Sequence, residues 1–414
     1  MAKDESSKLS VWPQARRWIE RLSQPRVQRL TTASVWTARG VAWRQRVRRR
    51  SLAAQDALKR LEPALKLPFF AASAAPALRF LLDTRHFSAE EIDQREYTPS
   101  TRARARIVVN PTSGSVTELT LRDLRETAEW LTKHGLPTEL RLTRGAGHAT
   151  RLAQDAVNAD MDMVIAAGGD GTVNDVIQAL AGHTTALGVL PVGTVNVWAR
   201  EIGIGLALSE AREVLLQGVQ RRVDLGRAGK RYFLMMAGIG FDAEVAQRAE
   251  EGWLKRFGLK MLDYIGAVIS LSVTAKPSDL RIQIGASHRN ERALMVIIGN
   301  TRLYGGAMTF TQNAVADDGA LDVVVIGNGG LAHRLGVLGR AFLRLPSAGP
   351  HVRYTRAQSV RVTSSKAEPV QVDGEVIGRL PMTFTIVPQA LRVILPTNAP
   401  HDLFRQRAQP WRAQ

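Results

Sequence analysis

The sequence contains no cysteine among its 414 residues. This absence excludes disulfide bonds, zinc sites built on thiolates and thiol nucleophiles, and it fits a reducing compartment such as the cytoplasm. Acidic residues are also scarce: 38 Asp and Glu stand against 56 Lys and Arg, which leaves a formal net charge of +18 at pH 7. Such an excess predicts an anionic partner, which is a nucleic acid, an acidic lipid surface or a phosphorylated substrate.

Long uninterrupted hydrophobic runs are missing as well. The apolar segment 66–83 contains Pro68, Pro76 and Arg79, so it is too short and too broken for a membrane span. The first apolar run lies far from the N-terminus and has no clear cleavage site, so we expect no signal peptide. The length and the hydrophobic content of 45% predict a folded chain of two domains.

More than half of the net positive charge lies near the N-terminus. Residues 1–50 carry 13 Lys and Arg against 3 Asp and Glu. Tryptophan recurs among these cations at Trp12, Trp18, Trp36 and Trp43. This mixture suits a segment lying on an anionic membrane surface, whereas nucleic-acid binding and a solvated tail are the alternatives. We assign residues 1–103 to a basic, membrane-associating extension and expect no specific nucleic acid.

The chain then alternates four times between strand and helix patterns. Apolar runs predict strands at 105–110, 138–143, 161–167 and 186–192, and helical spacing of apolar residues follows the first three. This alternation predicts a mostly parallel α/β sheet with ligands beyond the carboxyl ends of its strands. We assign residues 104–225 to this domain.

Short alternating runs dominate the rest of the chain. They predict strands at 230–240, 279–286, 293–300, 320–327, 359–364 and 382–388, with helices at 254–273 and 331–345. Strands without intervening helices favour an antiparallel sandwich or barrel-like sheet. We assign residues 226–389 to this mainly β domain. Residues 390–414 then hold a last strand, 390–396, which is a candidate to return to the first domain, and a tail.

Polar, glycine-rich loops follow the predicted parallel strands. They are NPTSGS (110–115), Thr143 with RGAGH, GGDGTVND (168–175) and GTVN (193–196). No lysine follows these glycines, which excludes a Walker phosphate loop, and the spacing is not GxGxxG. Glycine still lets the backbone approach a phosphate, and a helix N-terminus offers free N–H groups. Because Asp170 would repel a phosphate directly, we predict that it acts through a cation such as Mg²⁺.

Seven motifs in one order resemble the catalytic region of diacylglycerol kinases and related lipid kinases, including sphingosine kinases. They are VVNPTSGS, AAGGDGTVNDV, LPVGTVNVWAREIG, AGIGFDAEV, IIGNTRLYGGAM, DDGALDVVVI and VDGE, between residues 104 and 396. The resemblance implies an ATP-binding α/β domain distantly like that of NAD kinases. It also implies an antiparallel β-sandwich-like domain after it, with the substrate bound between the two.

The resemblance also implies roles for individual residues. Glu375 of VDGE matches the proton acceptor, with Asp373 as the competing candidate. A structural Mg²⁺ falls on the side chain of Asp318 and the carbonyls of Val315 and Ala320. The nucleotide contacts fall on Asn110, Pro111, Thr112, Ser113, Gly114, Thr143, Gly169, Asp170, Gly171, Thr172, Val173, Asn174, Asp175 and Thr194. From their place in the first helical turn, Asn174 and Asp175 either reach the ligand or cap the helix.

The expected function is therefore an ATP- and Mg²⁺-dependent lipid kinase. It would transfer the γ-phosphate to a hydroxyl of diacylglycerol or a similar lipid, as a cytoplasmic protein peripheral at the inner face of the membrane. The alternatives are a kinase of the same fold for a sphingoid base or a soluble acceptor, and a non-catalytic binder of anionic membranes. Val197 departs from the family, because many bacterial relatives carry an aspartate there and valine cannot bind a cation. The oligomeric state is left open, with a homodimer as one option.

Overall fold

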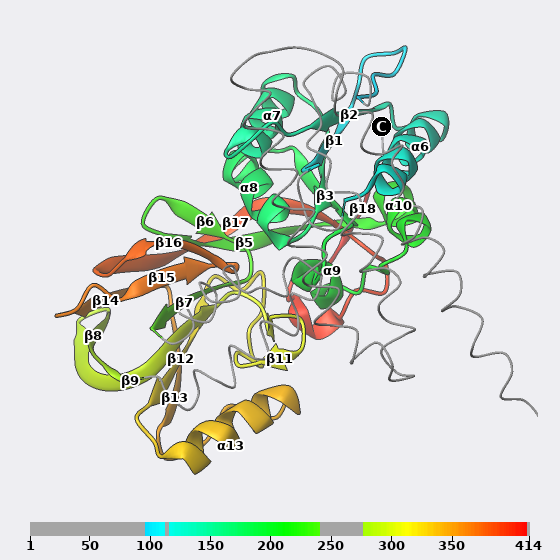
Figure 1. Cartoon of the computed structure of the whole chain (residues 1–414). Coiled ribbons are helices and arrows are strands. Elements are labelled where there is room, and N and C mark those ends of the chain that lie inside the picture. The colour runs from blue at the N-terminus through cyan, green and yellow to red at the C-terminus, as the bar shows by residue number, and fades with distance from the viewer. Residues whose placement is uncertain (1–95, 112–115, 241–275, 412–414) are drawn as a thin grey trace, which may run out of the picture. The chain divides into compact units, whose positions relative to one another are not determined.

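The structure, a computed structural model, describes residues 96–111, 116–240 and 276–411. Most of the predicted basic extension, the predicted helix at 254–273 and the residues Thr112, Ser113 and Gly114 lie outside the described residues. In the described part of the chain, sixteen strands belong to one continuous hydrogen-bonded sheet. Figure 1 shows its parallel part beside α6–α8 and its antiparallel part below them.

The parallel part confirms the predicted α/β domain. Its strands lie in the order β2–β1–β3–β4. Their bounds are β1 Ala105–Val109, β2 Thr138–Leu142, β3 Met163–Gly168 and β4 Ala186–Pro191. Helices pack against these strands: α6 Glu118–Lys133, α7 His148–Asn158, α8 Asp170–Leu180 and α10 Leu208–Gln217, with the short α9 Val197–Glu201 before α10. Every residue of β3 and β4 is buried, as their uninterrupted apolar runs predict for strands covered on both faces.

Helix α6 illustrates how the local sequence sets these elements. The hydroxyl of Thr117 accepts a hydrogen bond from the backbone N–H of Thr120 at 3.2 Å and so caps the helix N-terminus. Leu121, Leu124 and Leu131 recur at helical spacing and are buried. The helix therefore packs one apolar face against the sheet and leaves its charged face in water.

The second part of the sheet is antiparallel, as predicted. Its longer strands are β5 Val219–Ala228, β7 Met236–Gly240, β8 Ser278–Ile284, β9 Ser287–Gly299, β12 Leu321–Gly327, β13 Val352–Ala357, β14 Ser359–Ser364, β15 Pro369–Val372, β16 Glu375–Arg379 and β17 Met382–Leu395. The shorter elements are β6 Arg231–Phe233, β10 Leu303–Tyr304, β11 Met308–Thr309, β18 Gln409–Pro410, helix α13 Leu331–Phe342 and the 3₁₀ turn His401–Leu403. A second hydrophobic core, which includes Phe233, Val296 and Phe384, lies among these strands.

Strand β17 joins the two parts of the sheet. The sequence predicts two strands, 382–388 and 390–396, but the structure has one, with a register shift between Val387 and Leu391. Gln389 adopts a left-handed backbone there, with φ of 51°, and its N–H donates to Asp224 at 2.7 Å. Beyond the shift, Val393 pairs in parallel with Leu187 of β4. The C-terminal half of β17 thus lies next to β4 of the parallel part.

The ordered packing of the first part begins before residue 104. Tyr97 forms a bridge with Leu140, and the carboxylate of Glu96 accepts from the N–H of Leu142 at 3.1 Å. Residues that the sequence assigned to the extension therefore lie on β2. Among the helices that the structure describes, none is long and apolar enough to cross a bilayer.

Candidate active site

The predicted nucleotide loops lie at one edge of the parallel sheet. Asn110 and Pro111 follow β1, Thr143 follows β2, Gly169–Asp175 follows β3 and Thr194 follows β4. Because these strands are parallel neighbours, their carboxyl ends share one edge. This is the arrangement that the sequence predicts. Thr112–Gly114 lies outside the described residues, so that part of the first loop stays a prediction.

Glycine is required at two positions of these loops. A Cβ on Gly193 would lie 2.3 Å from Cα of Gly169, so a larger residue there would push the β3–α8 and β4–α9 loops apart. A Cβ on Gly168 would lie 2.2 Å from Oγ1 of Thr172, so a larger residue there would collide within its own loop. The sequence suggested only a close approach to a ligand.

Asp170 bridges the same two loops. Its carboxylate oxygens accept from the backbone N–H groups of Val197 at 3.0 Å and Trp198 at 3.2 Å, which caps the N-terminus of α9. Burial raises the pKa of Asp170, and these two N–H donors oppose the shift. A carboxylate has about four acceptor positions, so it can accept from these donors and still contact a cation or a ligand. Val197 is buried at the first position of the capped helix.

Asn174 points away from the loop edge and toward the second part of the chain. Its side-chain amide donates to the carbonyl of Tyr232 at 3.2 Å and to Asp373 at 2.8 Å, and it is buried. Its oxygen accepts from Gln178 at 3.3 Å. The Asn174 side chain therefore connects α8 to the VDGE turn and does not cap the helix, and its role as a nucleotide contact stays a prediction.

Asp373 is an acceptor for four N–H donors. The backbone N–H groups of Leu234, Met235 and Met236 donate at 2.8–2.9 Å, and the amide of Asn174 is the fourth donor. These hydrogen bonds lie where β6 ends and β7 begins, so the single strand predicted at 230–240 is two strands. Burial raises the pKa of Asp373, and the four donors oppose the shift because they stabilise the charged form. With its acceptor positions filled, Asp373 is a structural anchor, which argues against it as the proton acceptor.

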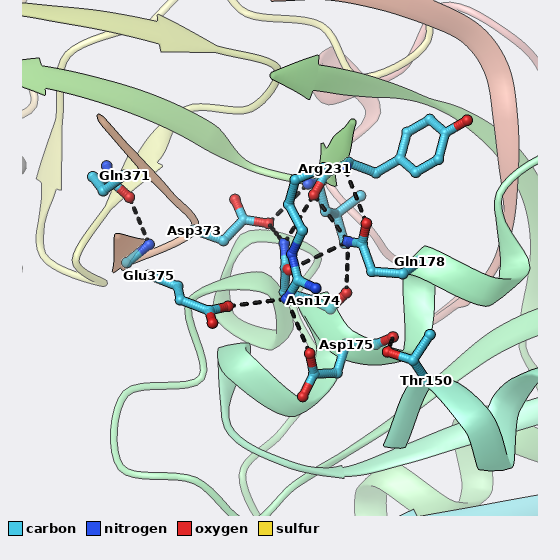
Figure 2. Close-up of polar contacts among 11 residues, drawn as sticks. Thr150, Asn174, Asp175, Gln178, Arg231, Gln371, Asp373 and Glu375 are labelled. Atoms are coloured by element: carbon cyan, nitrogen blue, oxygen red, sulfur yellow. Dashed lines mark hydrogen bonds and ion pairs between the residues drawn. The ribbon is translucent and has the colours of Figure 1, made fainter. Parts of the chain in front are cut away.

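Glu375 differs from Asp373 in both exposure and partners. Its side chain is 53% exposed and lies 2.9 Å from Nη2 of Arg231. The same nitrogen lies 2.9 Å from Asp175 of α8. Figure 2 shows the Arg231 guanidinium between these two carboxylates, with Asn174 and Asp373 beside them. The turn is braced by the N–H of Gly374, which donates to Gln371 at 2.7 Å.

Arg231 is the site residue that sequence reasoning missed. Its guanidinium joins the first turns of α8 to the VDGE turn, and its side chain is 27% exposed. Within the described residues, its Nε is buried and lacks a hydrogen-bond partner. A buried donor without a partner costs about 1–3 kcal/mol, so an incoming acceptor oxygen would be stabilised there.

Other predicted contact residues have buried side chains. Val173 and Thr172 are 3% and 7% exposed, and Thr143 is 6% exposed with its N–H donating to the carbonyl of Val109 at 2.8 Å. Such residues can present only backbone atoms or a hydroxyl edge to a nucleotide. The nucleotide roles of Gly169, Gly171 and Thr194 stay predictions.

The loop predicted to hold a structural Mg²⁺ carries its own counter-charges. The Asp318 side chain is fully buried, and it pairs with Arg356 and, at 3.3 Å, with Arg405. In this structure, the Asp318 carboxylate that would bind the cation forms ion pairs with these two guanidinium groups. Across the described ranges, no group of three or more His, Asp or Glu side chains is placed to hold a metal. The metal role of Val315, Asp318 and Ala320 stays a prediction.

Comparisons with known proteins agree with this architecture. The family model described as "Diacylglycerol kinase catalytic domain" matches residues 104–228, and the one described as "YegS C-terminal NAD kinase beta sandwich-like domain" matches residues 236–395. The sequence is 33% identical over 304 residues to a diacylglycerol kinase of Staphylococcus carnosus (strain TM300), covering 72% of this chain and 96% of that protein. It is 29% identical over 303 residues to that of Bacillus subtilis (strain 168), covering 72% and 99%.

A solved structure shares the fold. It is a diacylglycerol kinase from Bacillus anthracis str. Sterne, with a TM-score of 0.57 and 20% identity, covering 72% of this chain and 98% of that one. Together the matches confirm the two-part fold, and the catalytic-domain match identifies a kinase, which uses ATP. The chain belongs to the diacylglycerol kinase family.

Proposed function

We propose that the chain is an ATP- and Mg²⁺-dependent lipid kinase that phosphorylates a hydroxyl of diacylglycerol or a similar lipid at a membrane surface. The observation that carries this proposal is the Arg231 bridge, which holds Asp175 of the nucleotide-side helix and Glu375 of the VDGE turn on one guanidinium nitrogen. Phosphoryl transfer needs a base and charge-stabilising donors at one place. In this bridge, Glu375 is the base and Arg231 provides the charge-stabilising donors.

Glu375 takes the role of proton acceptor in this proposal. It is exposed enough to meet a hydroxyl, whereas Asp373 is committed to four N–H donors. A carboxylate at this position can accept the proton of a lipid hydroxyl. Removing the hydroxyl proton turns a poor alcohol nucleophile into one that attacks phosphorus.

Arg231 is the charge-stabilising group. Its guanidinium offers N–H donors in a planar fork that matches phosphate oxygens. The buried Nε has no partner in the described part of the chain, so movement of Arg231 toward the phosphate would give this donor an acceptor. Release of Arg231 toward the phosphate would also free Glu375 for the hydroxyl.

Asp170 is the residue we propose to hold the divalent cation with the nucleotide. Mg²⁺ commonly takes one or two carboxylates together with phosphate oxygens, and Asp170 keeps acceptor positions beyond its two N–H donors. When bound, the cation would neutralise charge on the phosphates. No step of the proposal uses the Asp318 loop.

Incubation of the purified chain with γ-labelled ATP, Mg²⁺ and a panel of lipid alcohols in mixed micelles tests the proposal. We expect label in diacylglycerol or a related lipid. Label on a sphingoid base would change the acceptor and keep the mechanism. Label confined to a soluble acceptor, or no transfer in the presence of bound ATP, would contradict the proposal.

A further inference from the structure

Helix α13 has two apolar faces, and only one of them packs against the protein. Val337 and Ala341 are buried, at 8% and 2% exposure, and the helix packs on β11 (Figure 1). Leu331, Leu335 and Phe342 are 50%, 49% and 41% exposed. Positions i, i+4 and i+11 lie within about 40° on a helix of 100° per residue, so these three side chains form one outward stripe.

The turn after α13 extends this stripe. Leu343 and Leu345 are 72% and 42% exposed. Of the eight large hydrophobic side chains exposed in the described residues, five therefore lie between 331 and 345. The turn is held in place, because the carbonyl of Leu345 accepts from Gln312 at 2.6 Å and the hydroxyl of Ser347 donates to Phe310 at 2.8 Å. Scattered exposed leucines need no explanation, but a contiguous group marks an interaction surface.

The segment that carries this surface is rich in cations. Residues 323–367 contain no Asp or Glu and seven Lys and Arg, of which Arg353 and Arg356 pair with carboxylates outside this range. Arg340 and Arg344 lie on α13 and its turn, and both carry long aliphatic stems. Leucine and phenylalanine flanked by arginine suit a helix that lies in a bilayer interface, with its apolar side chains below the headgroups and its cations among them.

We infer that the outward stripe of Leu331, Leu335, Phe342, Leu343 and Leu345 is a docking surface that inserts into the interface of an anionic bilayer. The inference rests on the proposed function, because it supplies the contact through which a kinase core would reach a lipid hydroxyl. The arginines beside the stripe are complementary in charge to an anionic bilayer. A second copy would bring the same cationic surface against itself, and residues 1–50 carry a net charge of +10, from 13 Lys and Arg less 3 Asp and Glu.

Because the chain has no cysteine, a single introduced cysteine reports on one position. The full chain carrying Leu335→Cys is labelled with an environment-sensitive NBD fluorophore. Leu119→Cys, on α6 and 60% exposed, is the matched control. Each is mixed with vesicles of phosphatidylglycerol and phosphatidylcholine, with pure phosphatidylcholine vesicles, and with vesicles that carry a nitroxide quencher in the acyl chains.

We expect the probe at position 335 to shift to the blue and to be quenched with anionic vesicles, while the probe at 119 stays in water. We also expect Leu335→Glu combined with Phe342→Glu to reduce co-sedimentation with anionic vesicles by about ten-fold. A chain that co-sediments while the probe at 335 stays in water overturns the inference, as does a chain that does not co-sediment. So does a dimer in lipid-free sedimentation that Leu335→Glu converts to a monomer.

The two proposals fail separately. If the wild-type chain phosphorylates no lipid in mixed micelles, the proposed kinase function fails, and the probe still reports whether α13 enters a bilayer. If lipid is phosphorylated in micelles but the probe stays in water on vesicles, only the docking surface fails.

Discussion

Replacing Asp373 by asparagine tests the anchor role of that carboxylate. Four N–H donors point at its two oxygens, with Asn174 and Leu234 on one and Met235 and Met236 on the other. Asparagine keeps one oxygen and turns an NH₂ group toward the other pair of donors. The left-handed backbone at this position, with φ of 47°, suits asparagine as well as aspartate, so the substitution adds no backbone strain.

The expected loss follows from the two hydrogen bonds removed. A hydrogen bond to a charged group contributes about 1.5–3 kcal/mol, so Asp373→Asn should lower the free energy of unfolding by about 3–6 kcal/mol. Chemical denaturation followed by circular dichroism measures this loss. Asp279→Asn is the control, because the Asp279 side chain is 80% exposed and 4.0 Å from its nearest arginine; a change below about 0.5 kcal/mol is expected there.

Activity separates an anchor from a base. Below its melting temperature, Asp373→Asn should keep measurable turnover. A variant as stable as the wild type that has lost turnover would refute the anchor role and restore Asp373 as the proton acceptor.

Three further substitutions test Arg231 and the helix α9 beside Asp170. Arg231→Met should lower kcat by about ten-fold or more, because an Arg donor at a developing charge is lost. Arg227→Met, at an exposed position of β5, should leave kcat unchanged in the same kinase assay. Burial raises the pKa of Glu201 to about 7 from 4.5; the folded chain then holds this proton more tightly than the unfolded chain, so stability is lost as the pH rises from about 4.5 to about 7. As the pH rises between these limits, the free energy of unfolding of Glu201→Gln should increase by about 3 kcal/mol relative to that of the wild type, as measured by melting curves. Val197→Asp places a second carboxylate beside Asp170, so it should lower the melting temperature without Mg²⁺ and regain part of it when Mg²⁺ is added.

Each of these outcomes has a contrary result. Equal kcat for Arg231→Met and the wild type would remove Arg231 from the site. A constant stability difference between Glu201→Gln and the wild type across the pH range would show that Glu201 titrates near its ordinary pKa. A melting temperature of Val197→Asp that does not respond to Mg²⁺ would place the cation away from α9.

The parallel part of the fold was predictable because its signal is local. The continuous apolar run before the glycine loop becomes the fully buried β3, and the spacing of Leu121, Leu124 and Leu131 becomes the inner face of α6. Four loops that follow four strands could be placed at one sheet edge from topology alone. Short alternating runs predicted the antiparallel part, and the order of the motifs predicted the role of the VDGE turn.

The remaining features depend on contacts between distant residues. Asp170 caps helix α9, which follows another strand. The backbone N–H groups of Leu234 and Met235, which lie between β6 and β7, donate to Asp373 in a distant part of the chain. Arg231 lies in a predicted strand, and nothing in the sequence around it indicates that it belongs to the site. The spacing of acidic residues in DDGALD likewise does not show that Arg356 is their partner.

In the function that we propose, α8 and the VDGE turn form one phosphoryl-transfer site with Glu375 as its base. The most direct measurement is single-turnover transfer from γ-labelled ATP to diacylglycerol by Glu375→Gln, with ATP affinity measured on the same sample. We predict a loss of about 10²–10⁴-fold in the transfer rate, the usual contribution of a general base, with ATP affinity unchanged within about two-fold. An unchanged transfer rate would exclude Glu375 as the base.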